Sequence, residues 1–128
     1  NRLRAQRHLA TFVDSLHRAD TSARIVIAGD FNDTPSAITK RKIMPSWCTP
    51  LMLTAEQRGE GTIVYDGRWL MYDNFWIDAQ AFPTARAQVY IRRDLISTKG
   101  GARPIRTFTS RAYTAGPSDH LPVILHLY

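Results

Sequence analysis

The sequence has only one cysteine, Cys48, and no apolar run long enough to span a membrane. A single cysteine excludes an internal disulfide, and with it a small scaffold held together by disulfides. A membrane-spanning helix needs about 18 or more consecutive apolar residues. The longest apolar runs here, such as Ile25-Val26-Ile27-Ala28, are the length of a strand. We therefore predict no membrane span, and a buried, unreactive Cys48.

Acidic residues are also scarce. The chain has 11 Asp and Glu against 17 Lys and Arg, which gives a formal net charge of +6 at pH 7. A basic surface favours anionic partners such as nucleic acid, phospholipid head groups or phosphorylated small molecules. The positive residues are scattered along the chain, so charge alone indicates only the class of partner.

The length of 128 residues is enough for one small domain. The chain has no initiator methionine and no signal-peptide pattern, and it begins inside a predicted helix. We expect a further N-terminal portion of the protein to precede Asn1. The sequence leaves localisation open.

Hydrophobic periodicity and turn residues predict an α/β (α+β) fold with a mixed or mostly antiparallel sheet and flanking helices. An amphipathic helix comes first, and a β-branched run after it predicts a buried strand. Asp66-Gly67, between two apolar segments, is typical of a hairpin turn. The predicted helices cover 1–20 and 36–43, and the predicted strands cover 24–28, 62–65, 68–77, 88–91 and 121–127; 45–61 shows no regular pattern.

Asp30 and Asn32 follow the predicted strand 24–28, where the chain leaves the sheet. The end of a strand holds side chains rigidly, and functional residues often gather there. An aspartate offers a hard oxygen ligand for a divalent cation, or a base for water. An asparagine amide can hold a phosphate oxygen or a metal. Taken alone, the two residues are more typical of an ordinary turn in which both bond the local backbone.

A second polar segment, Ser118-Asp119-His120, lies between Gly116-Pro117 and the last predicted strand. Its Asp and His offer a metal ligand and a group able to contact a phosphoryl oxygen. This segment, too, is ordinary turn composition when it is considered alone.

Together the motifs are more specific. Gly29-Asp30-Phe31-Asn32 after an apolar run, followed much later by Ser118-Asp119-His120-Leu121-Pro122-Val123, resembles the endonuclease/exonuclease/phosphatase superfamily with the DNase I-like fold. The segment 69–77 resembles the family strand whose Asp orients the catalytic His, which nominates Asp73. The stretch 100–108 resembles a bacterial branch of the family. The resemblance covers essentially the whole chain and identifies residues 1–128 as the C-terminal half of such a domain.

The resemblance implies roles for five residues. Asp30 would position and activate the attacking water, and Asn32 would orient that water or the phosphate. Asp119 would bind a metal, Mg²⁺ or Mn²⁺, and His120 would bind the scissile phosphate. Asp73 would orient the imidazole of His120. As metal ligands the resemblance nominates Asp30, Asn32, Asp119 and His120.

The family's first half supplies an Asn and a metal-binding Glu that are absent here, because neither Glu56 nor Glu60 follows a predicted strand. The family fold is a four-layer sandwich to which each half contributes one sheet. We therefore expect residues 1–128 to be inactive alone, and to pair with a missing N-terminal half or to swap with a second chain.

Two functions remain open from the sequence. The first is metal-dependent hydrolysis of a phosphodiester or phosphomonoester, with nucleic acid as the first candidate substrate and a phospholipid or a sugar or inositol phosphate as alternatives. The second is a non-catalytic half domain that binds an anionic partner or assembles with another chain. Because one fold supports many substrates through its loops, the choice depends on segments such as 45–61 and 82–86.

Overall fold

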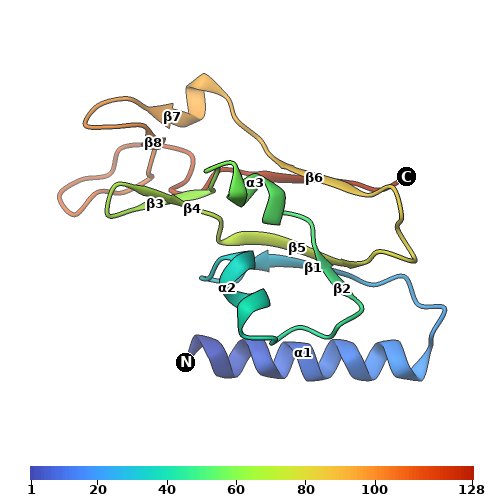
Figure 1. Ribbon diagram of the computed structural model, residues 1–128. Helices are drawn as coiled ribbons and strands as arrows, with labels where there is room; N and C mark the ends of the chain where they lie inside the picture. The colour runs from blue at the N-terminus through green and yellow to red at the C-terminus, as the bar shows by residue number, and fades with distance from the viewer.

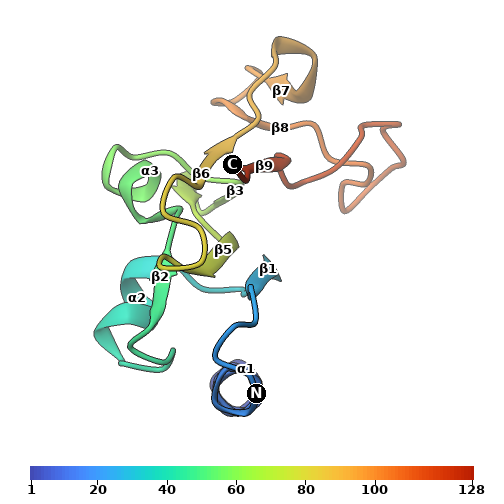
Figure 2. The same cartoon turned by 90° about the vertical axis from the view of Figure 1, so that its right-hand side faces the viewer.

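The computed structural model describes all residues 1–128, and it arranges helices and small antiparallel sheets in successive layers (Figure 1). Figure 2 looks along the N-terminal helix, with the sheets following one another away from it. The helices are α1 (Arg2–Ala19), α2 (Pro35–Lys40) and α3 (Leu53–Gln57), with a 3-10 turn at Arg93–Leu95. The strands are β1 (Val26–Asp30), β2 (Cys48–Pro50), β3 (Ile63–Tyr65), β4 (Arg68–Leu70), β5 (Asp73–Asp78), β6 (Arg86–Val89), β7 (Ile96–Ser97), β8 (Arg103–Pro104) and β9 (Val123–His126).

Strand β5 is the centre of the fold. It pairs antiparallel with β1 on one side and with β2 on the other. Its side chains are buried on both faces, because successive residues of a strand point to opposite sides and both sides are covered. Phe75 faces one hydrophobic cluster, with Met52, Met71 and Leu121, and Trp76 belongs to the other, with Val13 and Ile38.

Helix α1 packs on the Trp76 side of this sheet through one face. Its buried residues are Gln6, Ala10 and Val13. Phe12 and Leu16, which share the helical spacing of the apolar residues, are 59% and 43% exposed. The buried face of α1 therefore does not coincide with the face expected from the spacing of its apolar residues. A polar side chain, Gln6, occupies part of the buried face.

The structure confirms the α+β class and the antiparallel pairing. The strands form one three-stranded sheet and three two-stranded ones, β3–β4, β6–β9 and β7–β8. The predicted helix at 1–20 and the hairpin at Asp66-Gly67 are present, and both turn residues have positive φ. None of the helices is long and apolar enough to cross a bilayer.

Three local predictions are wrong. The strand predicted at 68–77 is two strands, because the chain breaks at Met71–Tyr72 and β5 leaves the hairpin to pair with β1. The segment 45–61 contains β2 and α3, although it shows no periodicity. The strand predicted at 24–28 runs from Val26 to Asp30, so Asp30 is its last residue instead of lying in the turn beyond it.

Candidate active site

Asp30 and Asp73 face each other across the β1–β5 pair. Asp30 ends β1, Asp73 begins β5, and the two are partners in the antiparallel register. The Cβ atoms of such partners lie about 4.5–5.5 Å apart, and like charges in these positions repel. The fold therefore fixes two carboxylates at one end of the sheet, where a cationic group between them is favoured.

His120 supplies that group. Its Nδ1 lies 2.7 Å from Oδ2 of Asp73, and its Nε2 lies 4.0 Å from Oδ2 of Asp30. The side chains of His120 and Asp73 are 23% and 18% exposed, and that of Asp30 is 39% exposed. Asp73 is thus the inner partner that holds the imidazole, and Asp30 is the more exposed of the two carboxylates.

The charges around His120 favour its protonated form. Burial lowers the pKa of His120, but the hydrogen bond and negative charge of Asp73 raise it, as do the charges of Asp30 and Asp119. The net direction of the pKa is upward. An imidazolium in this position has both ring nitrogens as donors, one to Asp73 and one available to an anionic ligand.

Thr62 connects the two segments that carry Asp73 and His120. It is completely buried, and its Oγ1 accepts hydrogen bonds from the backbone N–H groups of Tyr72 and Asp73, each at 3.3 Å. Its carbonyl accepts the N–H of Leu121 at 2.7 Å. Leu121 is buried beside Met71 and Phe75, so the residue after His120 is anchored in the core.

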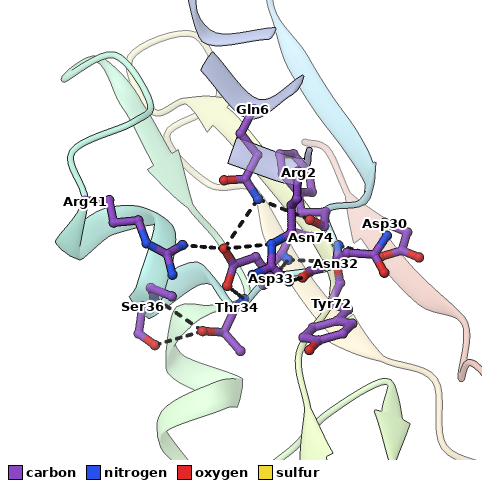
Figure 3. Close-up of polar contacts among 12 residues, drawn as sticks. Arg2, Gln6, Asp30, Asn32, Asp33, Thr34, Ser36, Arg41, Tyr72 and Asn74 are labelled. Carbon is purple, nitrogen blue, oxygen red and sulfur yellow. Dashed lines mark hydrogen bonds and ion pairs between the residues drawn. The ribbon is translucent and has the colours of Figure 1, made fainter. Parts of the chain in front are cut away.

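Asn32 follows Asp30 in a tight turn. Its backbone N–H donates to Oδ1 of Asp30 at 2.7 Å, and its φ of 49° is in the left-handed region, which Asn tolerates better than most residues. In an extended backbone the side chains of Asp30 and Asn32 would point to the same side, and this turn replaces that conformation. The side chain of Asn32 is exposed beside Asp30, as Figure 3 shows.

Residues near the start of α1 donate hydrogen bonds to the backbone of the turn that follows Asp30. Gln6 donates from Nε2 to the carbonyl of Phe31 at 3.2 Å, and Arg2 donates from Nη1 to the carbonyl of Asn32 at 2.7 Å (Figure 3). Phe31 in turn continues the β1–β5 ladder, donating its N–H to the carbonyl of Tyr72 at 2.8 Å. The backbone on both sides of Asp30 is therefore fixed by contacts from other elements.

Asp33 is the polar centre beneath the loop. It is 7% exposed, and its Oδ2 contacts a guanidinium nitrogen of Arg41, Nε of Arg2 at 3.7 Å and Nε2 of Gln6 at 3.5 Å. Asn74, 1% exposed, lies against it and donates from Nδ2 to the carbonyl of Asp33 at 3.3 Å. These contacts tie α1, α2 and β5 to the loop that carries Asp30.

Of the five residues predicted from the sequence, the structure brings Asp30, Asp73 and His120 together, with ligand atoms within 4.8 Å of one another. Asp119 is exposed next to this trio and makes no hydrogen bond or ion pair with it. Neither glutamate is at the site: Glu56 accepts hydrogen bonds from the backbone N–H of Ser36, at 2.9 Å, and from its hydroxyl, while Glu60 pairs with Arg58 at 3.3 Å.

Four residues that support the site were not predicted from the sequence: Thr62, Asp33, Gln6 and Arg2. Only Gln6 left a signal: a polar residue one helical turn before Ala10 and near Val13, on the helix face that is buried. The other three depend on partners far away along the chain, and no local pattern marks them.

The donors at the site fit part of a divalent-metal shell. Carboxylate oxygens suit Mg²⁺ and Mn²⁺, and these cations take about six ligands. Oδ2 of Asp73 is engaged with His120, which leaves Asp30 as the open carboxylate of the trio. Asp119 and Asn32 provide further exposed oxygens nearby. The residues present can thus hold one side of a cation and not a complete shell.

Comparison with known proteins identifies a family for the chain. The whole chain, residues 1–128, matches the family model described as the Endonuclease/Exonuclease/phosphatase family. No curated protein and no solved structure matches it. The chain belongs to the endonuclease/exonuclease/phosphatase family, and its general chemistry is that of phosphoester hydrolases.

Proposed function

We propose that this chain carries part of the active site of a divalent-metal-dependent phosphodiesterase, a nuclease-like enzyme whose first candidate substrate is nucleic acid. The observation that carries the proposal is the His120 imidazole, held by Asp73 at 2.7 Å and open toward Asp30 at its other nitrogen. The net charge of +6 favours a polyanionic substrate.

In this mechanism each of the three residues has a separate task. Asp73 keeps Nδ1 of His120 protonated and orients the ring, as a carboxylate does in a catalytic triad. The Nε2–H of His120 donates to a non-bridging oxygen of the scissile phosphate and offsets the charge that develops there. Asp30 accepts a hydrogen bond from the attacking water and takes its proton.

Asn32 and Asp119 complete the proposed site. The Asn32 amide is exposed beside Asp30 and orients the water or a phosphate oxygen, and Asp119 acts with Asp30 as a metal ligand. A bound Mg²⁺ or Mn²⁺ supplies positive charge at the phosphate and lowers the pKa of water.

We further propose that another segment of the protein, or a second copy of the chain, completes the site. One open carboxylate in the trio is too few for a metal shell. β1 is an edge strand, and an open pocket of about 630 Å³ lies along it, lined by Leu9, Ile27, Ala28 and other residues. An unpaired edge beside apolar side chains favours a further protein segment. The complementing segment would bring the missing carboxylate.

Hydrolysis of bis(p-nitrophenyl) phosphate tests the enzyme proposal. The complete polypeptide that contains residues 1–128 should release nitrophenol, lose this activity in EDTA and regain it with Mg²⁺ or Mn²⁺. Activity that persists in EDTA contradicts the metal-dependent mechanism. Faster turnover of a phospholipid, a sugar or inositol phosphate or a phosphomonoester than of DNA or RNA contradicts the nucleic-acid assignment.

The same assay tests the need for a complementing segment. The 128-residue chain alone should show no turnover, and activity should appear when the preceding part of the protein is supplied. EDTA-sensitive turnover by the isolated chain contradicts the idea of an incomplete site. An inactive complete polypeptide that still binds polyanions favours the alternative of a non-catalytic binding domain.

A further inference from the structure

The loops on either side of β8 bring three unpaired cations around one open pocket of about 640 Å³. Lys99, Arg103 and Arg106 line it, and no acidic residue does. None of the three forms a salt bridge, whereas Arg2, Arg41 and other arginines elsewhere are paired with carboxylates. Grouped cations without counter-charge repel one another, and an anion between them relieves that repulsion.

The backbone around this pocket is ordered by its own hydrogen bonds. β7 and β8 form a hairpin whose turn contains Gly100 and Gly101, with φ of 72° and 101°, the region where glycine costs least. Arg103 donates from Nη2 to the carbonyl of Lys99 at 3.4 Å. The hydroxyl of Thr114 donates to the carbonyl of Arg106. The cations therefore extend from a defined scaffold.

This scaffold is connected directly to the catalytic segment. The carbonyl of Ile105 accepts the N–H of Ser118 at 3.3 Å, and the hydroxyl of Ser118 accepts the N–H of His120 at 3.0 Å. Two Cα–Cα steps of about 3.8 Å separate Ser118 from His120. Gly116 packs so closely on the carbonyls of Ile105 and Arg106 that a Cβ there would collide with them. The pocket is therefore built on a segment that is hydrogen-bonded to the one that carries His120.

The chemistry of the pocket suits a phosphate group. Guanidinium forks match phosphate oxygens in geometry and charge, and a lysine adds a compact positive charge. The hydroxyl of Ser110 is a further donor in the lining. Phe108 and Tyr113, 65% and 66% exposed with ring centroids 5.2 Å apart, lie on the same loop. Exposed aromatic rings beside a cationic surface are typical of proteins that bind single-stranded nucleic acid.

We propose that the pocket lined by Lys99, Arg103 and Arg106 binds a phosphate group of a single-stranded nucleic acid other than the phosphate that is cleaved. The pocket thereby selects polynucleotides over substrates that have only one phosphate. The preference for polynucleotide substrates rests on the proposed hydrolytic function, whereas the binding of a phosphate group in the pocket does not.

Equilibrium binding tests the pocket without turnover. Fluorescein-labelled oligothymidylate is titrated in EDTA with the complete polypeptide, with the double variant Arg103→Gln/Arg106→Gln and with the control Lys40→Gln/Lys42→Gln. The control removes the same charge from two exposed side chains at the C-terminal end of α2, away from β7 and β8 (Figure 1). Equal thermal unfolding of the variants checks that both fold.

The double variant should bind at least about tenfold more weakly, because the loss of even one charge-assisted hydrogen bond to phosphate lowers affinity by about that factor. The slope of log affinity against log salt concentration should fall by about 0.7, since the contact to one single-strand phosphate is lost. The control should keep the affinity and the slope. Unchanged binding by the double variant, or an equal loss in the control, overturns the proposal. Lys99→Gln provides a second test should the double variant unfold.

A turnover comparison separates this proposal from the proposed function. With Mn²⁺, Arg103→Gln/Arg106→Gln should hydrolyse bis(p-nitrophenyl) phosphate at the wild-type rate and the oligonucleotide at least about tenfold more slowly. If neither substrate is hydrolysed by the wild type, the hydrolytic function fails and the binding titration still decides the pocket. Binding to phosphatidylserine–phosphatidylcholine vesicles without binding to the oligonucleotide overturns the assignment to nucleic acid.

Discussion

Replacing Asp73 with Asn removes the negative charge beside His120 and preserves the shape of the side chain. In the wild type, Oδ2 of Asp73 lies 2.7 Å from Nδ1 of His120, a distance expected for a charge-assisted hydrogen bond. Such bonds contribute about 1.5–3 kcal/mol. If the bond acts in the transition state, its loss lowers kcat by about 10- to 150-fold.

The assay is phosphodiester hydrolysis by the complete polypeptide at saturating metal. Asp66→Asn is the matched control, because Asp66 is an exposed carboxylate in the β3–β4 turn, where a left-handed φ of 49° also suits Asn. The control should keep wild-type activity. If Asp73→Asn is as active as Asp66→Asn, Asp73 does not position His120 for catalysis.

The same substitution has a pH-dependent effect on stability in metal-free buffer. Burial lowers the pKa of His120, but Asp73, Asp30 and Asp119 raise it, and the net pKa lies above its ordinary value. A raised folded-state pKa contributes stability that is fully present below the unfolded pKa of about 6.5. That stability is lost as the pH rises through the folded pKa. Urea unfolding should therefore show a larger loss for Asp73→Asn at about pH 5.5 than at about pH 9. Equal losses at both values refute the ion pair.

Three further changes test the surroundings of the site. Asp33→Asn should destabilise the fold by about 1–3 kcal/mol in urea unfolding, because the buried carboxylate is the shared partner of Arg2 and Arg41; an unchanged midpoint contradicts this role. Thr62→Val should lower the free energy of unfolding by about 2–3 kcal/mol and Thr62→Ser by much less, because only Val leaves two backbone N–H groups without an acceptor. Equal losses of stability in the two variants would show that the hydroxyl of Thr62 is not needed. Burial, with smaller contributions from nearby carboxylates, raises the pKa of the Cys48 thiol to about 12. At about pH 8 only about one molecule in ten thousand therefore carries a Cys48 thiolate, and disulfide reagents should react with Cys48 only after denaturation. Rapid reaction of the folded protein would contradict the burial of Cys48.

The features predicted correctly from sequence are those that neighbouring residues determine. The helix at 1–20 follows from apolar spacing, and the hairpin follows from Asp66-Gly67, whose left-handed conformations suit those two residues. The existence of the strand that leads to Asp30, though not its exact bounds, follows from the apolar run before it. Each of these signals lies within a few residues of the structure that it predicts.

The features that sequence did not reveal depend on distant pairing. Asp73 is opposite Asp30 only because β5 leaves its hairpin and pairs with β1, and the residues of 68–77 show no reason for that break. Its nomination came from a family resemblance. Gln6 and Thr62 hold backbone groups that lie 25 and 11 residues away along the chain, respectively. Such contacts follow from the packing of whole elements.

The central claim is that Asp30 and His120 perform phosphoester hydrolysis in this protein. The most direct measurement is kcat of the complete polypeptide on a chromogenic phosphodiester, for Asp30→Ala and His120→Ala and for His126→Ala, an exposed histidine in β9, as the control. We predict a loss of at least about a hundredfold for each of the first two, as for removal of a general base or a transition-state donor, and wild-type activity for the control. Full activity in Asp30→Ala and His120→Ala would contradict the site.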